Sequence, residues 1–478
     1  MTTTANAPTR AIRGPNAAKW VTLAAATLGI VYGYDQSNIG GAQLYAQPDL
    51  EVSNQVWSFI AASVVYGELT GVIIGGWLVN KISRRNTMIV VAAGYVIFCL
   101  ASALSVDTFM LEASRYFLGV TIGLSLIAAP VFIAESVPSA TRGRTLVMYQ
   151  LATVFGVILG FVGALLLSQV NPEYNWRIML GLAAIPAALL LPVLVKLPKT
   201  ARWLMLKGRE DEARRSLLLI EPDRDPEEEL AIMRAAMAEE TGGALKEMFS
   251  KPYFRATVFV VVLGFLVQIT GINATITYGP AIFQQMGIES DAMNTGMNAL
   301  VQVIAFIAVL FAMRYIDNWG RRPVLLTGIS IMIAAQLLLV LVFASAGEGG
   351  SFSTWQDIGG FLGLAFINVG FVIGFGSLWV VYSTESFPAR LRSLGASFML
   401  TANLAANILV AQFFLTIMDE LGGAGSFAIF ALLAAFAWVF VFKVAPETKG
   451  RDLDDIRLFW ENGGKWPKDQ MESADLGR

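Results

Sequence analysis

The octapeptide Glu135-Ser-Val-Pro-Ser-Ala-Thr-Arg142 occurs a second time, little changed, as Glu385-Ser-Phe-Pro-Ala-Arg-Leu-Arg392, and each copy closes a long apolar run interrupted by glycines. A second duplication relates Trp77 to Asn86 (WLVNKISRRN) to Tyr315 to Pro323 (YIDNWGRRP), again between apolar segments. Each octapeptide sets a carboxylate before a helix-stopping proline and an arginine after it, which suits a charged latch at a membrane surface. Two duplications in the same order indicate a chain of two related halves, a pattern typical of transporters.

The composition is that of a membrane protein. Of the 478 residues, 55% are hydrophobic and 15% are charged, whereas a soluble chain carries about 25% charged residues; the mean hydropathy is +0.60. The net charge of -2 offers no basic surplus for phosphates, so we expect no nucleic-acid partner. Histidine is absent, which excludes imidazole chemistry and histidine metal sites. Cys99 is the only cysteine, so an internal disulfide is impossible.

Apolar windows of about twenty residues, the length that crosses a bilayer as a helix, predict twelve transmembrane spans. Six precede a charged centre and six follow it. They lie near residues 20–40, 57–79, 87–106, 109–132, 145–168, 177–197, 254–283, 294–315, 323–345, 357–384, 393–418 and 425–444. The predicted fold class is therefore an all-α membrane protein with twelve transmembrane helices, six on each side of a charged centre.

The connections between spans differ in charge, which predicts the orientation. The loops after spans 1, 7, 9 and 11 contain acidic residues but no Lys or Arg. The intervening loops are basic, so we place that side and both termini in the cytoplasm. Their basic residues are Lys81, Arg84, Arg85, Arg142, Arg144, Arg314, Arg321, Arg322, Arg390 and Arg392.

Four regions follow from this pattern: an N-terminal bundle over 1–199, a linker over 200–252, a C-terminal bundle over 253–445 and a cytoplasmic tail over 446–478. The linker is the only long hydrophilic insert. In it, Asp225 before Pro226 and three glutamates predicts the start of a helix. We expect a helical cytoplasmic linker and a polar, loosely ordered tail.

Taken together, these features resemble the sugar porter family of the major facilitator superfamily. The resemblance runs from Gly33-Tyr34-Asp35 to the tail motif Pro446-Glu-Thr-Lys-Gly-Arg451, nearly the whole chain. The family implies two six-helix bundles around a central cavity that move sugars or related polyols by alternating access. Between the two ends lie the further matching positions Arg115, Gly119, Gly123, Gly143-Arg144, Asp317 to Arg322, Gln268-Ile-Thr-Gly-Ile-Asn273 and Trp379.

The chain departs from the family pattern at several positions. Asn80 and Ser83 stand where the family usually has Asp and Gly, whereas Asp317 and Gly320 keep that pattern in the second half. The paired glutamines of span 7 are here Val267-Gln268. These departures bear on the identity of the substrate more than on the class of protein.

Span 7 carries polar side chains that lipid would not tolerate, because each exposed polar group adds a desolvation cost. On a straight helix Gln268 would point nearly opposite to Asn273, so the two could not face one ligand. The family resemblance implies a broken helix here, and Gly271 and Pro280 are residues that allow a break. We predict Gln268 and Asn273 as substrate ligands, with interhelical hydrogen bonding as the alternative. The polar set is Gln268, Thr270, Asn273, Thr275, Thr277 and Tyr278.

Uncharged amides suit a neutral polyol, since they donate to and accept from hydroxyls without burying a charge. The resemblance adds Gln150 in span 5 and Asn403 and Asn407 in span 11 to the substrate site; the two asparagines share one helical face. Trp379 in span 10 would supply an apolar wall against the sugar ring. Packing or interfacial anchoring is the alternative for Trp379.

Asp35 and Arg115 are intramembrane charges, which are functional candidates by default. Both lie roughly 8–9 Å below the same membrane surface, so they can pair if their helices touch. Separating the pair would change the proton affinity of the carboxylate, and the resemblance links an aspartate at this position to proton-coupled symporters. The alternatives are a static ion pair and a proton-coupling role for Glu68 in span 2.

The duplicated loops predict a latch that closes the cytoplasmic gate. Single surface ion pairs contribute only about 0–1 kcal/mol, but several partly buried ones can bias a two-state equilibrium by a few kcal/mol. The predicted gate residues are Glu135, Arg142, Arg144, Asp317, Arg321, Arg322, Glu385 and Arg392.

The sequence thus favours a secondary active transporter, a symporter of protons with a monosaccharide or polyol, in a bacterial plasma membrane and monomeric. The alternatives are a passive facilitator of the same fold and, less favoured because the tails are short, a sugar-binding nutrient sensor. We expect no enzyme and no cofactor, since the sequence offers no nucleophile–base pair, metal-ligand cluster or phosphate-binding glycine loop.

Overall fold

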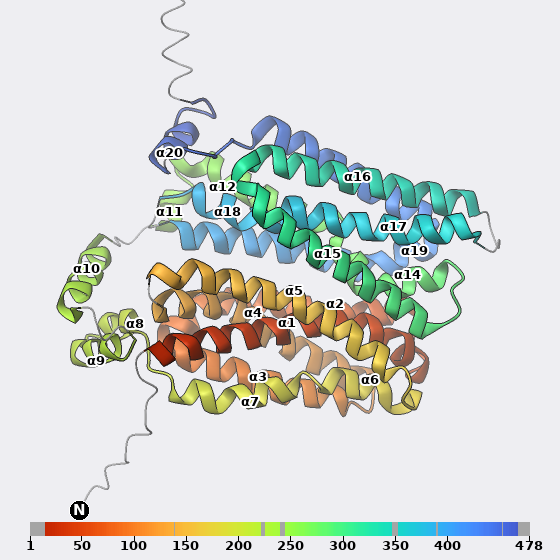
Figure 1. The fold of residues 1–478 in the computed structure, drawn as a ribbon, viewed down its shortest axis with the longest axis horizontal. Helices are drawn as coiled ribbons and strands as arrows, with labels where there is room; N and C mark the ends of the chain where they lie inside the picture. The colour runs from red at the N-terminus through yellow and green to blue at the C-terminus, as the bar shows by residue number, and fades with distance from the viewer. Residues whose placement is uncertain are drawn as a thin grey trace, which may run out of the picture. The chain divides into compact units, whose positions relative to one another are not determined.

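A computed structural model describes residues 15–137, 139–220, 225–239, 244–346, 352–388, 391–451 and 453–466, and the regular structure in these ranges is entirely helical (Figure 1). Two compact units divide the chain. Unit 1 comprises Met1–Asn38, Tyr66–Gly160 and Tyr174–Glu240, and unit 2 comprises Ile39–Val65, Phe161–Glu173 and Thr241–Arg478. The long helices α1, α2 and α5 therefore each contribute to both units.

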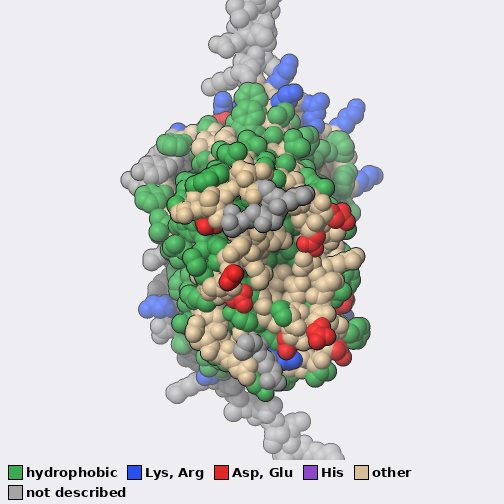
Figure 2. Space-filling view, turned by 90° about the vertical axis from the view of Figure 1, so that its right-hand side faces the viewer, with side chains coloured by type: hydrophobic (Ala, Val, Ile, Leu, Met, Phe, Trp, Pro, Cys, Tyr) green, Lys and Arg blue, Asp and Glu red, His purple; other side chains and the backbone are tan. Residues whose placement is uncertain are grey.

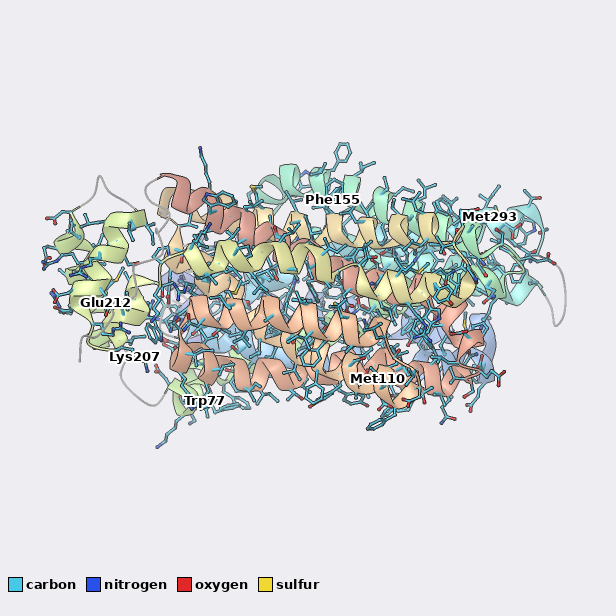
Figure 3. The ribbon with its side chains drawn as sticks, turned by 90° about the horizontal axis from the view of Figure 1, so that it is seen from below. Trp77, Met110, Phe155, Lys207, Glu212 and Met293 are labelled. Atoms are coloured by element: carbon cyan, nitrogen blue, oxygen red, sulfur yellow. The ribbon has the colours of Figure 1, made fainter. Side chains whose placement is uncertain are left out.

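In the first half, successive long helices run antiparallel through short connections, and α6 and α7 follow one another in the same direction (Figure 1). They are α1 (Pro15–Asp49), α2 (Asn54–Ile82), α3 (Arg84–Ala103), α4 (Thr108–Ser136), α5 (Ser139–Leu167), α6 (Pro172–Gly181) and α7 (Ala184–Lys196). Trp77 and Phe155 are 62% and 44% exposed and lie on the outside of unit 1 (Figure 3). Large apolar side chains in such positions fit a surface that faces lipid.

The second half begins with a helix that is interrupted twice. Its pieces are α12 (Lys251–Ile269), α13 (Ile272–Thr277) and α14 (Gly279–Gln285). The remaining helices are α15 (Asp291–Trp319), α16 (Arg321–Ala346), α17 (Thr354–Phe371), the π-helix η1 (Val372–Gly376), α18 (Ser377–Glu385) and α19 (Arg392–Val444). Within unit 2, α19 packs along both α12 and α16.

Ten helices in the described part of the chain are long and apolar enough to cross a membrane. The sequence predicted twelve spans, and two features explain the difference. α19 has 53 residues and contains the last two predicted spans, which are separated at Gly422, a residue with φ 66° and ψ 178°. α1 contains the first predicted span but is not among the ten; it carries the polar run Tyr34 to Asn38.

The predicted helical linker forms α8 (Ala201–Leu206), α9 (Glu210–Ile220), α10 (Pro226–Glu239) and α11 (Ala244–Met248). As expected, α10 begins at Pro226, and the Asp225 carboxylate accepts a hydrogen bond from the Glu227 amide. α8 and α9, marked by Lys207 and Glu212, lie beyond the ends of α3 and α7 (Figure 3). The indole of Trp203 donates to the Asn80 carbonyl at 2.9 Å and so ties α8 to α2.

The expectation of a loosely ordered tail is wrong for residues 453–461, which form α20 (Leu453–Glu461). The reason is an amphipathic spacing, because Ile456, Phe459 and Trp460 fall on one face and are buried. The Trp460 ring lies 5.1 Å from the Phe259 ring of α12, measured between centroids. Aromatic burial therefore holds this helix against unit 2.

Candidate substrate and proton sites

Unit 1 contains a buried ion pair between two of its helices. Arg115 of α4 donates from an Nη atom to Asp35 of α1 at 2.6 Å, and both side chains are only 2% exposed. Such a pair is stable while both partners are present, and removing one partner leaves an uncompensated buried charge. The geometry thus unites the two charges that the sequence singled out.

Glu68 of α2 is a third buried charge of unit 1, with 6% of its surface exposed. Glycines bring α2 and α4 into backbone contact on either side of it: a Cβ on Gly67 would lie 2.0 Å from the Tyr116 carbonyl oxygen, and one on Gly123 would lie 2.1 Å from the Glu68 carbonyl oxygen. This close crossing is what small residues permit between membrane helices. It holds Glu68 against the helix that carries Arg115.

The predicted break in span 7 is present. Gly271 adopts a left-handed conformation, with φ 92° and ψ 14°, between α12 and α13. A second interruption at Tyr278 precedes α14, which has a proline at its start. Because left-handed backbone favours glycine, Gly271 sets the direction in which α13 leaves α12.

The break allows amides from different helices to meet in unit 2. Gln268 of α12 donates from Nε2 to Oδ1 of Asn403 on α19 at 3.3 Å. The side-chain oxygen Oε1 of Gln268 is buried and has no hydrogen-bond partner among the described residues. Asn403, Asn407 and Asn273 are 6%, 7% and 8% exposed. Four of the six predicted substrate residues are therefore buried or partly buried polar groups of this unit.

Three buried amides that the sequence reading did not single out support the broken helix. Gln336 of α16 donates to the Thr270 carbonyl at 2.9 Å, at the point where α12 ends. Asn368 of α17 donates to the Thr275 hydroxyl at 3.2 Å and accepts from Gln302 of α15 at 3.3 Å. Each of the three is a polar residue within a predicted apolar span, so the criterion used for span 7 would also have identified them.

The two other predicted substrate residues lie in different surroundings. Trp379 is half-buried on α18, directly after η1, and π-helical turns occur frequently at functional sites. Gln150 is exposed on α5 and belongs to unit 1.

In unit 1, Arg84 at the start of α3 forms an ion pair with Glu135 at the end of α4. The Arg84 Nε atom lies 3.0 Å from Oε2 of Glu135, and both side chains are largely buried, with 7% and 11% exposed. Arg84 also donates to the Asn80 side chain at 3.0 Å. The side chains of Arg142 and Arg144 lie outside the part that the structure describes.

In the second half, the start of α16 is bound by Glu447, a residue that was not among the predicted gate residues. The Glu447 carboxylate accepts from the backbone amides of Arg321 and Arg322 at 3.0 and 3.1 Å, so it caps the start of α16. Arg321 also reaches Glu385 at 4.0 Å. Glu447 belongs to the tail motif that carried the family resemblance, but only the fold shows that this motif returns to the duplicated loop.

The second half contains three other predicted gate residues, Arg322, Arg392 and Asp317. Arg322 also donates to the Phe442 carbonyl, and Arg392 donates to the Phe387 carbonyl at 3.2 Å. The side chain of Asp317 lies outside the described part of the chain.

The duplicated loops share an unusual backbone conformation. Gly320 has φ 94° before α16, and Ser83 has φ 88° before α3. The Ser83 hydroxyl accepts a hydrogen bond from the Asn86 amide at 3.2 Å. Ser83 stands where the family usually has glycine, and its backbone adopts a conformation that favours glycine.

These features define a class of protein, a multi-pass membrane transporter of the major facilitator fold. Residues 21–460 match the family model described as Sugar (and other) transporter. The chain belongs to this family. Its relatives are transporters and not enzymes.

Among curated proteins, the chain is similar to a probable polyol transporter of Arabidopsis thaliana, with 30% identity covering 94% of this chain and 86% of the relative. It is 29% identical to the arabinose-proton symporter of Escherichia coli, over 91% of this chain and 92% of that one. A probable metabolite transport protein of Bacillus subtilis is 32% identical over 90% and 91% of the two chains.

Solved structures support the same fold. An inward-open structure of the xylose transporter of Escherichia coli has a TM-score of 0.79 at 23% identity and covers 93% of this chain and all of that one. A crystal structure of a D-xylose-proton symporter has a TM-score of 0.74 at 24% identity, over 91% and 99% of the two chains.

Proposed function

We propose that this chain couples the entry of a monosaccharide or related polyol to the inward movement of protons, by alternating access. The observation that carries the proposal is the buried Asp35–Arg115 pair at 2.6 Å, because an intramembrane carboxylate that can lose its counter-charge is a means of coupling protonation to conformation. The arabinose-proton symporter among the relatives supports this class of substrate and driving ion.

For the substrate, we propose contacts to Gln268, Asn273, Asn403 and Asn407 of unit 2. The side-chain oxygen Oε1 of Gln268 is buried without a partner among the described residues, so a hydroxyl group of a bound sugar could donate a hydrogen bond to it. Gln150 would contribute a further amide, and Trp379 would provide an apolar wall. All five polar groups are uncharged, which fits a neutral ligand better than a sugar phosphate or a sugar acid.

For the gate, we propose that the duplicated loops hold the transporter closed on the side that bears Arg84 and Arg321. The gate residues are Glu135, Arg142, Arg144, Asp317, Arg321, Arg322, Glu385 and Arg392. Each pair contributes little alone, and their sum sets the population of two states. From the distribution of Lys and Arg over the loops, we place this side and both termini in the cytoplasm. We further propose that the protein acts as a monomer in a plasma membrane.

The test is uptake into proteoliposomes. The purified chain is reconstituted and offered labelled L-arabinose, D-xylose and a polyol such as xylitol, with and without an imposed pH gradient, and protein-free liposomes serve as the control. Accumulation of one of these compounds above its external concentration only when the outside is acidic supports symport. Equilibration at a rate that is independent of the gradient would replace the proposal with a passive facilitator.

A further inference from the structure

A cavity lies within unit 2, and none of the amides described above is among its lining residues. Its volume is about 420 Å³, within the range of small-molecule sites. It is open on one side and is lined by the end of α1, the turn between α1 and α2, the helix α14 and a residue of α19. Its amide-bearing lining residues are Gln43, Gln47, Asn54, Gln284 and Gln285. We call it the Gln43 cavity.

Three of these amides form a one-way relay of hydrogen bonds. Gln43 donates to the side-chain oxygen of Gln47 at 3.1 Å, and Gln47 donates to that of Asn54 at 2.7 Å. Asn54 donates to both carboxylate oxygens of Asp419, at 3.0 and 2.9 Å. Every amide of the relay thus donates in the same direction, and the relay ends on an anion.

The relay leaves its first acceptor open. Gln43 is only 4% exposed, and its Oε1 atom has no hydrogen-bond partner among the described residues. Each donation toward the Asp419 carboxylate polarises the amide behind it, which makes that oxygen a better acceptor. An unsatisfied buried oxygen costs free energy, so a ligand that donates a hydrogen bond to it would offset that cost.

The rest of the lining narrows the class of ligand. Glu51, with φ 51°, lies at the turn and adds a carboxylate, while none of the described lining residues is Lys or Arg. Leu44, Val52 and Leu415 supply apolar surface. Acidic side chains are also visible on the face of the molecule at which α15 begins and α16 ends (Figure 2). Negative charge disfavours phosphorylated or acidic sugars, whereas hydroxyl donors with an apolar face fit the cavity.

We infer that the Gln43 cavity is a second binding site, for a small neutral polyhydroxylated molecule that donates a hydroxyl to Gln43. The inference goes beyond the proposed function, because it concerns a site other than the one around Gln268 and does not require transport. Water is the competing occupant, since a polar cavity of this size holds several waters.

The experiment measures protection of a cysteine that is introduced at the rim. Gln284 is exposed and lines the cavity, so Gln284→Cys in a Cys99→Ala background gives a single reactive thiol. Its labelling by a maleimide is timed in detergent at increasing xylitol concentration. Dimethoxyethane, which accepts but cannot donate hydrogen bonds, is the control ligand. We expect xylitol to slow labelling in a saturable way and dimethoxyethane to have no effect.

Added substitutions locate the protecting site. Gln43→Leu should raise the half-protecting xylitol concentration at least fivefold, the loss expected for about one hydrogen bond. Gln285→Ala, at an exposed lining position that folding does not need, should raise it in the same direction if Gln43→Leu does not fold. Gln55→Leu, at an exposed glutamine of α2 outside the lining, should leave it unchanged, and so should Gln268→Ala.

Three results would overturn the inference. Absence of xylitol protection would mean that the cavity holds water only. Protection that persists in both Gln43→Leu and Gln285→Ala would place the ligand elsewhere. Protection lost in Gln268→Ala alone would mean that the rim responds to the other site. Failure of transport in proteoliposomes, with xylitol protection intact, would reject the proposed function but not this site.

Discussion

Replacement of Gly271 by alanine tests whether the broken helix is imposed by the backbone at this position. Gly271 has φ 92°, and a left-handed conformation costs an L residue about 1–2 kcal/mol. The added Cβ would lie 2.7 Å from the Phe430 ring, and overpacking of a core usually costs about 1–3 kcal/mol. Alanine restricts the unfolded chain and returns about 0.5 kcal/mol. The expected destabilisation is therefore about 1.5–4.5 kcal/mol.

Gly287→Ala is the matched control. Gly287 also has a positive φ, 84°, but a Cβ there would meet nothing within 4 Å. Only the backbone cost of about 1–2 kcal/mol applies. Thermal unfolding of both variants in the same detergent, with calorimetric titration of the transported sugar, separates the packing cost from the backbone cost.

We expect Gly271→Ala to unfold at a lower temperature than Gly287→Ala and to bind sugar more weakly, because Asn273 lies two residues beyond the break. Equal unfolding temperatures, together with wild-type affinity in Gly271→Ala, would refute the reasoning. A loss of affinity without a loss of stability would show instead that α13 redirects itself at little cost.

Three further predictions concern residues that the fold brought into view. Ser83→Gly should stabilise the protein by about 1 kcal/mol, because it relieves a backbone that favours glycine and loses only a cap worth a few tenths; the reverse change, Gly320→Ser, should lower the unfolding temperature, and equal effects of the two would contradict the assignment. Glu447→Gln should destabilise the start of α16 by about 1 kcal/mol, seen as faster limited proteolysis there, and unchanged cleavage would exclude the cap. Gln336→Leu should leave the Thr270 carbonyl unpaired, costing about 1–3 kcal/mol, and should weaken sugar binding; wild-type affinity in this variant would reduce Gln336 to a packing residue.

Local features of the sequence predicted much of the fold. Apolar windows located most of the spans. The family resemblance implied the break in span 7, and the break falls at Gly271 because left-handed backbone favours glycine. The windows also separated the last two spans where the backbone of α19 breaks, at Gly422 with φ 66° and ψ 178°. The first span differs from its prediction, because α1 is not among the ten helices that are apolar enough to cross a membrane.

The sequence predicted contacts in the candidate sites only where each contacting residue was unusual in its own span. Asp35 and Arg115 stood out as charges in apolar spans, and their pairing follows once their depths match. By contrast, the approach of Glu447 to the start of α16 joins residues 126 positions apart. No local spacing encodes such a contact. The relay from Gln43 to Asp419 was missed for the same reason, since its last step joins residues 365 positions apart.

The most direct measurement of the central claim compares two modes of sugar movement in Asp35→Asn. Asparagine keeps the size of the side chain but cannot take up or release a proton. Arg115 then remains buried without its counter-charge, at a cost of several kcal/mol, so thermal unfolding must first show that the variant is folded.

In proteoliposomes, labelled sugar is followed once as accumulation driven by a pH gradient and once as exchange against internal sugar without a gradient. We predict that Asp35→Asn loses accumulation and keeps exchange, because the substrate amides remain in place while the coupling carboxylate is absent. If Asp35→Asn still concentrates sugar against its gradient in step with proton movement, Asp35 does not couple transport to protons.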